Sequence, residues 1–551
     1  MTGAGQATAN VASALAEQAA AQGASTAIFY PTGLRRGQIQ YSTCSYRELD
    51  QLSDAYARGL QEYGIGRGSR TALMVPPGLD FFALFFALFK AGVVPVLIDP
   101  GIGLKPLKAC LAEARPEAFI GISKAQAARA LLRWAPDSIR KRVTAGPRLG
   151  WGGISTRQLA ALGERSSGPV LAPTRGGEMA AILFTSGSTG IPKGVVYRHR
   201  HFVAQVGLLR AAFGIEAGEV DLPTFPPFAL FDPALGMTTV VPWMDPTRPA
   251  RANPELLFQS IERFGVTNVF GSPALLRVLG GHAKQKGLVL KSVRRVISAG
   301  ASVPIKAARD MQSALPKGAE VFSGYGATEC LPVTRVAASE LDEEIAAHTA
   351  GGDGICVGRP VAPNRVCIMP IRDSAEEQLP EEELLPAGVT GEVVVHGPTA
   401  TDAYWQRETQ TRNAKCTDSY GRVWHRMGDI GYLDQLGRLW YCGRKSQRVE
   451  VNGSTLFPDQ VEAYFNTHPE VRRTALVGAA GKAVLCVETD ARPNRHRRER
   501  IATDLRQMAR SHARFQVVET VLFHPDFPVD IRHNSKIGRE RLAAWAEKHL
   551  A

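Results

Sequence analysis

A glycine-rich segment, FTSGSTGIPKG at residues 184–194, follows the apolar run AAIL and restricts both the architecture and the ligand of this chain. Its glycines allow backbone conformations that are closed to other residues, so that successive N–H groups can turn inward on an anion. No Walker A register fits, and a flexible connector would need neither the Pro-Lys-Gly ending nor a preceding buried strand. The segment predicts a polyphosphate cradle formed by Thr185, Ser186, Gly187, Ser188, Thr189, Gly190 and Lys193.

Length and charge set the next limits. The chain has 551 residues, too many for one ordinary hydrophobic core, so we predict at least two domains. Hydrophobic residues make up 44% and charged residues 21%, which is typical of a globular protein. The net charge is +13, with the densest basic run, RPNRHRRER, at residues 492–500. Because no aromatic residues interleave with this run, we predict no nucleic-acid partner; a solvated surface and an anionic docking site both stay open.

One stretch imitates a membrane span. FFALFFALFKAGVVPVLI at residues 81–98 approaches the necessary length but contains Lys90, Gly92 and Pro95. Its composition changes halfway from Phe, Leu and Ala to Val and Ile, so we interpret it as a buried helix, a glycine turn and a buried strand. We predict no transmembrane segment. The N-terminus has no secretory pattern and the cysteines are scattered, which favours a cytoplasmic protein with reduced thiols.

The chain divides into two parts by its patterns. Up to about Gly443, short β-rich apolar runs alternate with helical stretches, which is typical of an α/β architecture. After Arg444 the patterns predict a compact α+β module. Its helices are expected at residues 458–467, 499–512 and 538–549, and its strands at 473–478, 482–489 and 517–523. We therefore predict two domains, residues 1–443 and residues 444–551.

The order of motifs resembles the adenylate-forming enzymes, the superfamily of acyl-CoA synthetases, firefly luciferase and peptide-synthetase adenylation domains. After the glycine-rich segment come SAGASVP at 298–304, FSGYGATE at 322–329, HRMGDIGYLD at 425–434, GRKSQRVEVNG at 443–453 and RHNSKIGRERL at 532–542. This resemblance implies a large N-terminal domain of layered β-sheets and helices with a small β-barrel-like part. It also implies a small mobile α+β C-terminal domain, and ATP and Mg²⁺ as cofactors.

The resemblance assigns the nucleotide contacts residue by residue. Gly300, Ala301, Ser302, Tyr325 and Gly326 would surround the adenine; an aromatic residue before a glycine offers a flat face and a close backbone approach. Thr328 would present its hydroxyl to phosphate and Glu329 its carboxylate to Mg²⁺, which prefers oxygen ligands. Asp429 and Arg444 would contact the ribose.

Lys536 corresponds, by the same resemblance, to the catalytic lysine that the small domain brings to the site. Its charge would stabilise the substrate carboxylate and the α-phosphate as they react. The domain would pivot near Ser446. Together with Thr328 and Glu329, Lys536 forms the predicted catalytic set.

Three residues differ from common family patterns at positions that bear on the step after the acid is activated. Ala229, Ser446 and Glu450 stand where many relatives carry His, Asp or Lys, and Lys. With WMDPTRPARANPELL and RHNSKI, these departures resemble the β-lactone synthetases of long-chain olefin biosynthesis. That resemblance implies a 3-hydroxy fatty acid that is activated as an acyl-AMP and closed to a β-lactone by its own hydroxyl. The candidate acyl pocket is lined by Phe228, Phe231, Val269, Phe270 and Gly271.

Other functions stay open at this stage. An ordinary long-chain acyl-CoA synthetase would form a thioester with coenzyme A, and a related enzyme would load a separate carrier protein. An inactive, basic binding protein that keeps the nucleotide fold is a third alternative, which intact Thr328, Glu329, Asp429 and Lys536 disfavour. We also hypothesise that the basic run docks another enzyme of the same pathway or a membrane carrying the lipid. His199 and His201 are interpreted as structural.

Overall fold

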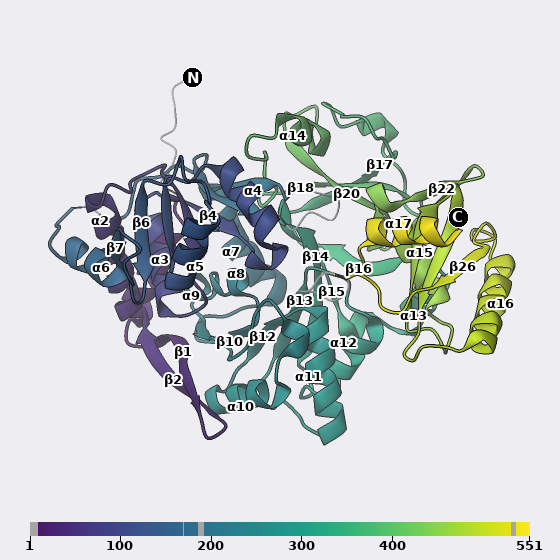
Figure 1. The fold of residues 1–551 in the computed structure, drawn as a ribbon, viewed down its shortest axis with the longest axis horizontal. Coiled ribbons are helices and arrows are strands. Elements are labelled where there is room, and N and C mark those ends of the chain that lie inside the picture. The colour runs from purple at the N-terminus through teal and green to yellow at the C-terminus, as the bar shows by residue number, and fades with distance from the viewer. Residues whose placement is uncertain (1–8, 169, 186–191, 530–535, 551) are drawn as a thin grey trace.

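The computed structural model describes residues 9–168, 170–185, 192–529 and 536–550. Its described part is a mixed α/β molecule with two large sheets and a smaller C-terminal unit at one end of the long axis (Figure 1). The predicted α/β class is therefore confirmed, with a large N-terminal sheet domain and a smaller C-terminal domain.

The first sheet has the order β7-β6-β5-β3-β4-β8-β9. Its strands are β3 (Arg70–Met74), β4 (Val94–Ile98), β5 (Ala118–Ile122), β6 (Lys141–Ala145), β7 (Ile154–Ser155), β8 (Met179–Phe184) and β9 (Gly194–Arg198). One face packs on α2 (Tyr46–Glu62), α3 (Leu79–Lys90) and α6 (Thr156–Glu164), and the other on α4 (Leu104–Ala114) and α5 (Ser123–Leu131). Strands β3 to β8 pair in parallel, whereas β9 returns antiparallel beside β8. The glycine-rich segment therefore connects two adjacent strands.

The membrane-like stretch folds as predicted. It forms α3, which ends at Lys90, and then strand β4. The Phe side chains of α3 are buried in the largest core cluster. Lys90 is buried at the end of this helix because its Nζ lies 2.6 Å from Asp50 Oδ1 and also contacts Asp54, both on α2. Within the described residues, no helix is both long and apolar enough to cross a bilayer.

The second sheet follows the order β17-β18-β20-β21-β16-β15-β14-β13-β12-β10-β11-β1-β2, with β19 beside β20. Its central strands are β10 (Val220–Pro223), β11 (Thr238–Val240), β12 (Asn268–Gly271), β13 (Arg295–Ala299), β14 (Glu320–Ala327) and β15 (Cys330–Ala337); β1 (Thr26–Arg35) and β2 (Gln38–Ser45) close one end. Helices α10 (Pro254–Phe264), α11 (Pro273–Lys286) and α12 (Ile305–Gln312) cover one face. Helix α7 (His199–Phe213) and the short turns α8 (Pro226–Ala229) and α9 (Asp232–Leu235) lie against the other.

The expectation of a small β-barrel-like part is wrong. Strands β16 (Ile355–Pro360), β17 (Arg365–Met369), β18 (Gly391–His396), β19 (Lys415–Thr417), β20 (Val423–Leu433) and β21 (Leu439–Arg444) continue the second sheet. Among the described strands, β17 forms an edge and pairs only with β18, so the strands do not close on themselves. Helices α1 (Ala12–Gln22), α13 (Glu343–Ala350) and α14 (Glu408–Ala414) complete this large part.

The C-terminal unit has its own sheet and core. Strands β24 (Arg473–Ala479), β25 (Lys482–Glu488) and β26 (Thr520–Phe523) pack on α15 (Pro458–Phe465), α16 (Arg495–Ser511) and α17 (Arg539–Leu550), and a hairpin of β22 (Val449–Val451) and β23 (Ser454–Leu456) precedes them. Helix α16 starts four residues earlier than predicted. The Asn494 side chain accepts the Arg497 N–H and caps it, so the basic run lies in its first turns.

Candidate active site

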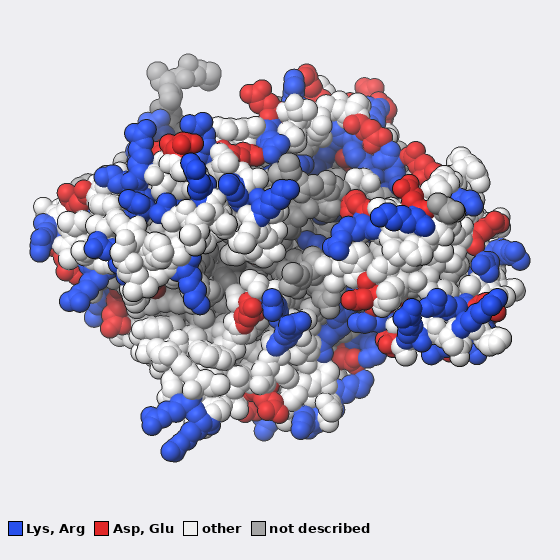
Figure 2. Space-filling model, viewed as in Figure 1, with Lys and Arg blue, Asp and Glu red and all other residues white. Residues whose placement is uncertain are grey.

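A large cavity lies between the sheet-rich part of the chain and the C-terminal unit. Its volume is about 2270 Å³. Thr185, Lys193, Thr328 and Glu329 line it from the large part, and Lys536 lines it from the C-terminal unit. Figure 2 shows a hollow near the middle of one face, with Lys and Arg side chains on its rim. The cavity therefore brings together predicted site residues that are hundreds of positions apart.

The glycine-rich segment is held at both described ends by the hairpin of β8 and β9. Phe184 pairs with Gly194, and the Thr185 N–H donates to the Lys193 carbonyl at 3.0 Å. A Cβ on Gly194 would lie 2.9 Å from Ile182 Cγ2, so a side chain there would disturb the strand pair. The hairpin thus places Thr185 and Lys193 together at the cavity. The predicted contacts Ser186, Gly187, Ser188, Thr189 and Gly190 lie outside the described residues.

Asp429 is a buried carboxylate that two neighbouring side chains hold in place. It is 2% exposed and pairs across β20 and β21 with Arg444, whose Nη1 lies 2.9 Å from Oδ1. The Tyr325 hydroxyl donates to Oδ2 at 2.6 Å. Burial raises the pKa of the Asp429 carboxyl, against the opposing effects of Arg444 and Tyr325. Oδ1 is buried against the Arg444 guanidinium, and Asp429 is not among the described residues that line the cavity.

Glu329 and Thr328 are positioned by two tyrosines. The Tyr404 hydroxyl donates to Glu329 Oε1 at 2.6 Å, and the Tyr197 hydroxyl donates to the Thr328 carbonyl at 2.5 Å. Lys193 Nζ lies 5.0 Å from the centre of the Tyr404 ring. One oxygen of the Glu329 carboxylate is thereby oriented, and the described residues contain no cluster of three metal-ligating side chains. The donor set fits a cation that one carboxylate and substrate phosphates hold together.

The predicted adenine segments have different surroundings. Gly300 and Gly326 line the cavity, whereas Ala301 and Ser302 do not. Gly300 has a φ of +93°, a conformation that favours glycine. A Cβ on Gly326 would lie 2.7 Å from the Cys330 carbonyl oxygen, so the close packing of β14 on β15 also needs a glycine. Neither Tyr325 nor Asp429, to which its hydroxyl donates, lines the cavity.

An aromatic wall forms the apolar end of the cavity. Phe228 and Phe270 stack with ring centres 3.7 Å apart, and Phe231 lies beside Phe228 with centres 6.3 Å apart. All three line the cavity, but Val269 and Gly271 do not. Side chains alternate along β12, so Phe270 faces the cavity while its neighbours face α11 and the core behind it.

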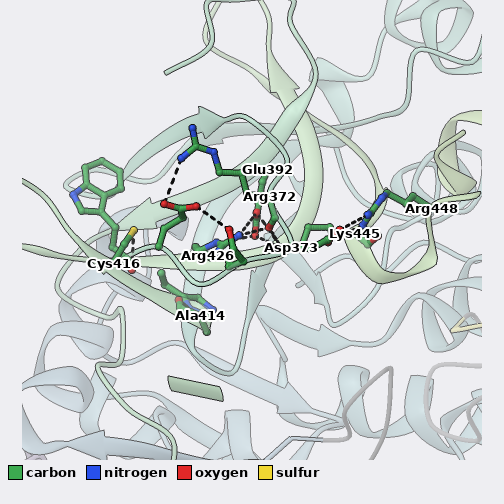
Figure 3. A network of polar contacts seen from close by, with 12 residues as sticks. Arg372, Asp373, Glu392, Ala414, Cys416, Arg426, Lys445 and Arg448 are labelled. Carbon is green, nitrogen blue, oxygen red and sulfur yellow. Dashed lines mark hydrogen bonds and ion pairs between the residues drawn. The ribbon is translucent and has the colours of Figure 1, made fainter. Parts of the chain in front are cut away.

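A buried ion network lies beside the predicted pivot, as Figure 3 shows. Glu392 on β18 is shared by Arg426 on β20, with a closest approach of 2.7 Å, and by Lys445, with Nζ 3.1 Å away. Arg448, three residues after Lys445, pairs with Asp373 at 2.6 Å. The chain on both sides of Ser446, which is exposed, is thus attached to the large sheet.

Several side chains around the site were not predicted from the sequence. Nothing in the sequence around Tyr404 and Glu392 indicated that they meet Glu329 or Lys445. His425 is buried here, and Lys415 beside it is half-buried. His425 carried a signal, because it begins the HRMGDIGYLD motif; Lys415 carried none.

The fold and these site residues define the class of protein. The family model "AMP-binding enzyme" matches residues 15–405, and this chain therefore belongs to the AMP-binding enzyme family. It is an ATP-dependent adenylate-forming enzyme. A solved structure, the amide bond synthetase McbA from Marinactinospora thermotolerans, has the same fold: its TM-score is 0.77 at 22% identity, over 97% of this chain and 99% of that chain.

Two relatives are much more similar in sequence. The olefin β-lactone synthetase of Stenotrophomonas maltophilia (strain K279a) is 54% identical, over 98% of each chain. The olefin β-lactone synthetase of Xanthomonas campestris pv. campestris is 52% identical, over 98% of this chain and 97% of that protein. The predicted resemblance to the adenylate-forming superfamily, and to this subgroup of it, is confirmed.

Proposed function

We propose that this enzyme activates a long-chain 3-hydroxy fatty acid with ATP and closes the acyl-AMP to a β-lactone. The observation that carries the proposal is the single cavity in which the phosphate-loop residues, Glu329 and Lys536 share a space with the Phe228–Phe270 wall. A polar nucleotide end and an apolar acyl end within one enclosure suit a fatty acid that must react with ATP. The printed names of the two 52–54% identical relatives favour the lactone as the product.

In the first half-reaction, the residues of the chain position and stabilise charge. Thr185 and Lys193 would hold the polyphosphate and Thr328 the α-phosphate. Asp429 would reach the ribose hydroxyls only after its contacts with Tyr325 and Arg444 rearrange. Glu329 would hold Mg²⁺, which when bound shields the phosphate charges. Lys536 would stabilise the negative charge shared by the substrate carboxylate and the α-phosphate while the carboxylate oxygen attacks phosphorus and pyrophosphate leaves.

In the second half-reaction, the substrate supplies its own nucleophile. The 3-hydroxyl oxygen forms a bond to the activated carbonyl carbon, the bond from that carbon to the phosphate oxygen breaks, and AMP leaves. The hydroxyl proton passes to solvent. Because nucleophile and electrophile belong to one molecule, no site for a second substrate is needed, and the aromatic wall has only to fold the chain correctly.

The domain arrangement belongs to the same proposal. Residues 1–443 would form the adenylate-forming domain and residues 444–551 the domain that carries Lys536, with the pivot at Ser446. The network of Glu392, Arg426 and Lys445 anchors the chain before Ser446 to the large sheet, and the Arg448–Asp373 ion pair after it would have to open for the domain to turn. A cytoplasmic location and association with other enzymes of the pathway are parts of the proposal that rest on the sequence.

The deciding experiment supplies ATP, Mg²⁺ and a long-chain 3-hydroxy fatty acid, with and without coenzyme A, and follows the products by mass spectrometry. The proposal expects a product one water lighter than the acid, together with AMP, whether or not coenzyme A is present. A thioester that forms only with coenzyme A would contradict the lactone and identify an acyl-CoA synthetase.

A further inference from the structure

His425 is a buried imidazole on the cavity side of strand β20. It is 2% exposed and lies opposite Lys415 of β19 in the strand register. Its Nδ1 is 3.0 Å from the Ala414 carbonyl oxygen, at the end of α14. Because a carbonyl can only accept, Nδ1 must carry the proton of this hydrogen bond. The neutral ring therefore presents Nε2 as an unprotonated acceptor.

The second nitrogen of this ring is available to a ligand. His425 lines the large cavity, and within the described residues Nε2 makes no hydrogen bond. Among the described residues that line this cavity, it is the only histidine. His199 and His201 are equally buried, but they do not line it. A merely structural histidine would not need one nitrogen fixed by the backbone and the other directed to a substrate cavity.

The charges around His425 identify the end of the cavity that it faces. Burial lowers the pKa of His425 well below its ordinary value, and the positive charges of Lys415, Lys193 and Arg444 lower it further, against the hydrogen bond to Ala414. Lys193 ends the glycine-rich segment and Arg444 pairs with Asp429, so these are cations of the nucleotide end. The side chains of the aromatic wall carry no charge.

Lys415 sits next to His425 in a similar setting. It is half-buried, and its Nζ donates to the Thr401 carbonyl. Burial lowers the pKa of Lys415 to about 8, while the Glu329 carboxylate opposes this shift. Lys193, Lys415 and Arg444 thus lie near His425, while Asp429, Glu329 and Asp402 are acids near one or another of these cations. Burial, together with the three positive charges, keeps His425 neutral in the empty site.

We infer that His425 is a proton-gated contact for the polyphosphate of ATP: neutral in the empty site, it takes a proton from the buffer onto Nε2 when the nucleotide binds, and donates that proton in a hydrogen bond to a phosphate oxygen. The negative charge of the nucleotide compensates Lys193, Lys415 and Arg444 and so favours the imidazolium. The charge-assisted hydrogen bond then adds to binding. When pyrophosphate leaves, the compensation is lost and the proton is released.

The test measures proton uptake on binding of MgATP, without the fatty acid, by titration calorimetry at pH 7 in two buffers of different ionisation enthalpy. Wild-type enzyme is expected to take up a measurable fraction of one proton. His425→Gln places a neutral amide near the position of Nε2 and is expected to bind MgATP without uptake. His425→Asn keeps a donor for the Ala414 carbonyl, removes the phosphate contact, and is expected to bind MgATP about tenfold more weakly, also without uptake.

His201→Asn is the matched control. His201 is a buried histidine whose Nδ1 accepts the Arg198 N–H at 3.0 Å, which the Asn oxygen can replace. This variant is expected to keep both the proton uptake and the affinity of the wild type. Thermal unfolding of each variant checks that the fold is intact.

Two results would overturn the inference: no proton uptake by the wild-type enzyme, or undiminished uptake by His425→Gln. The first does not depend on any variant folding. The inference rests on nucleotide binding by an adenylate-forming enzyme and not on the lactone. A thioester product would therefore refute the proposed ring closure and leave the role of His425 intact.

Discussion

At the residue scale, Lys536 is placed so that its loss should slow catalysis without lowering the stability of the fold. Its side chain is exposed and lines the cavity, on a segment that is anchored by the bridge between Val529 and Ile537. A cation in this setting acts mainly on charge that develops during the reaction.

Lys536→Ala is expected to lower the rate of acid-dependent ATP–pyrophosphate exchange about a hundredfold or more, because a preorganised charge is lost from the transition state. The melting temperature should stay the same, since little packing is removed. Lys548→Ala, an exposed lysine on α17, is the control and should exchange normally. Undiminished exchange in the Lys536 variant would refute its assigned role.

A second prediction at this scale concerns acid stability. Burial lowers the pKa of both His199 and His201 to about 4, from an ordinary value of 6.5. Between these values the unfolded chain binds more protons than the folded one, so stability is complete above pH 6.5 and falls as the pH approaches 4. His201→Asn should lose less stability than the wild type between pH 7 and pH 5, by on the order of 1 kcal/mol for each pH unit. Urea unfolding at both pH values measures this difference; parallel losses would contradict it.

At the scale of elements, strand β12 assigns different tasks to adjacent residues. Phe270 faces the cavity and stacks on Phe228, whereas Val269 is fully buried in the core beneath α10 and α11. The two-residue period of a strand forces this separation.

Phe270→Ala is therefore expected to raise the KM for a long-chain acid about tenfold, because a large apolar contact with the substrate disappears, and to leave the KM for ATP unchanged. Val269→Ala should instead lower the free energy of unfolding by about 1 kcal/mol or more, through a core cavity, with nearly normal kinetics. Steady-state kinetics and urea unfolding of both variants check the pair. Equal kinetic effects would show that β12 does not divide the two tasks in this way.

At the scale of the whole molecule, the C-terminal unit docks on the loop after α13. Arg514 Nη2 lies 2.9 Å from Asp353 Oδ1, and His512 Nε2 lies 3.0 Å from the Gly351 carbonyl oxygen. Gly352 has a φ of +83°, and a Cβ there would lie 2.7 Å from the Phe515 ring. This contact joins the C-terminal unit, which carries Lys536, to the large part of the molecule.

Gly352→Ala is expected to slow pyrophosphate exchange, because the added carbon separates the docked surfaces and withdraws Lys536. Gly481→Ala is the matched control. Gly481 has a φ of +70° and open space around its Cβ position, so this variant has a similar backbone strain to Gly352→Ala but no steric clash. The double variant Gly352→Ala/Lys536→Ala should be no slower than Lys536→Ala alone. If the losses of exchange rate in the double variant are fully additive, the contact does not act by positioning Lys536.

Local chemistry made several residues that line the cavity predictable. Thr185, Lys193, Glu329 and Lys536 stand in short segments whose glycine spacing, hydroxyls and charges are legible along the chain, and all four line the cavity. The helix–turn–strand interpretation of residues 81–98 succeeded for the same reason, since residue type changes where the element changes. A resemblance over most of the chain supplied the rest.

Contacts between residues that are far apart in the sequence could not be predicted from local patterns. Sequence alone determined the α/β architecture and the ordered motifs of an adenylate-forming enzyme, and it predicted a phosphate-binding segment, because those patterns are local. Only the tertiary structure decided that Tyr325 meets Asp429, 104 residues away, that Phe270 but not Val269 reaches the cavity, and that the strands from β16 to β21 stay an open sheet. Strand register and sheet order bring these groups together, and both arise from long-range packing that no local pattern encodes.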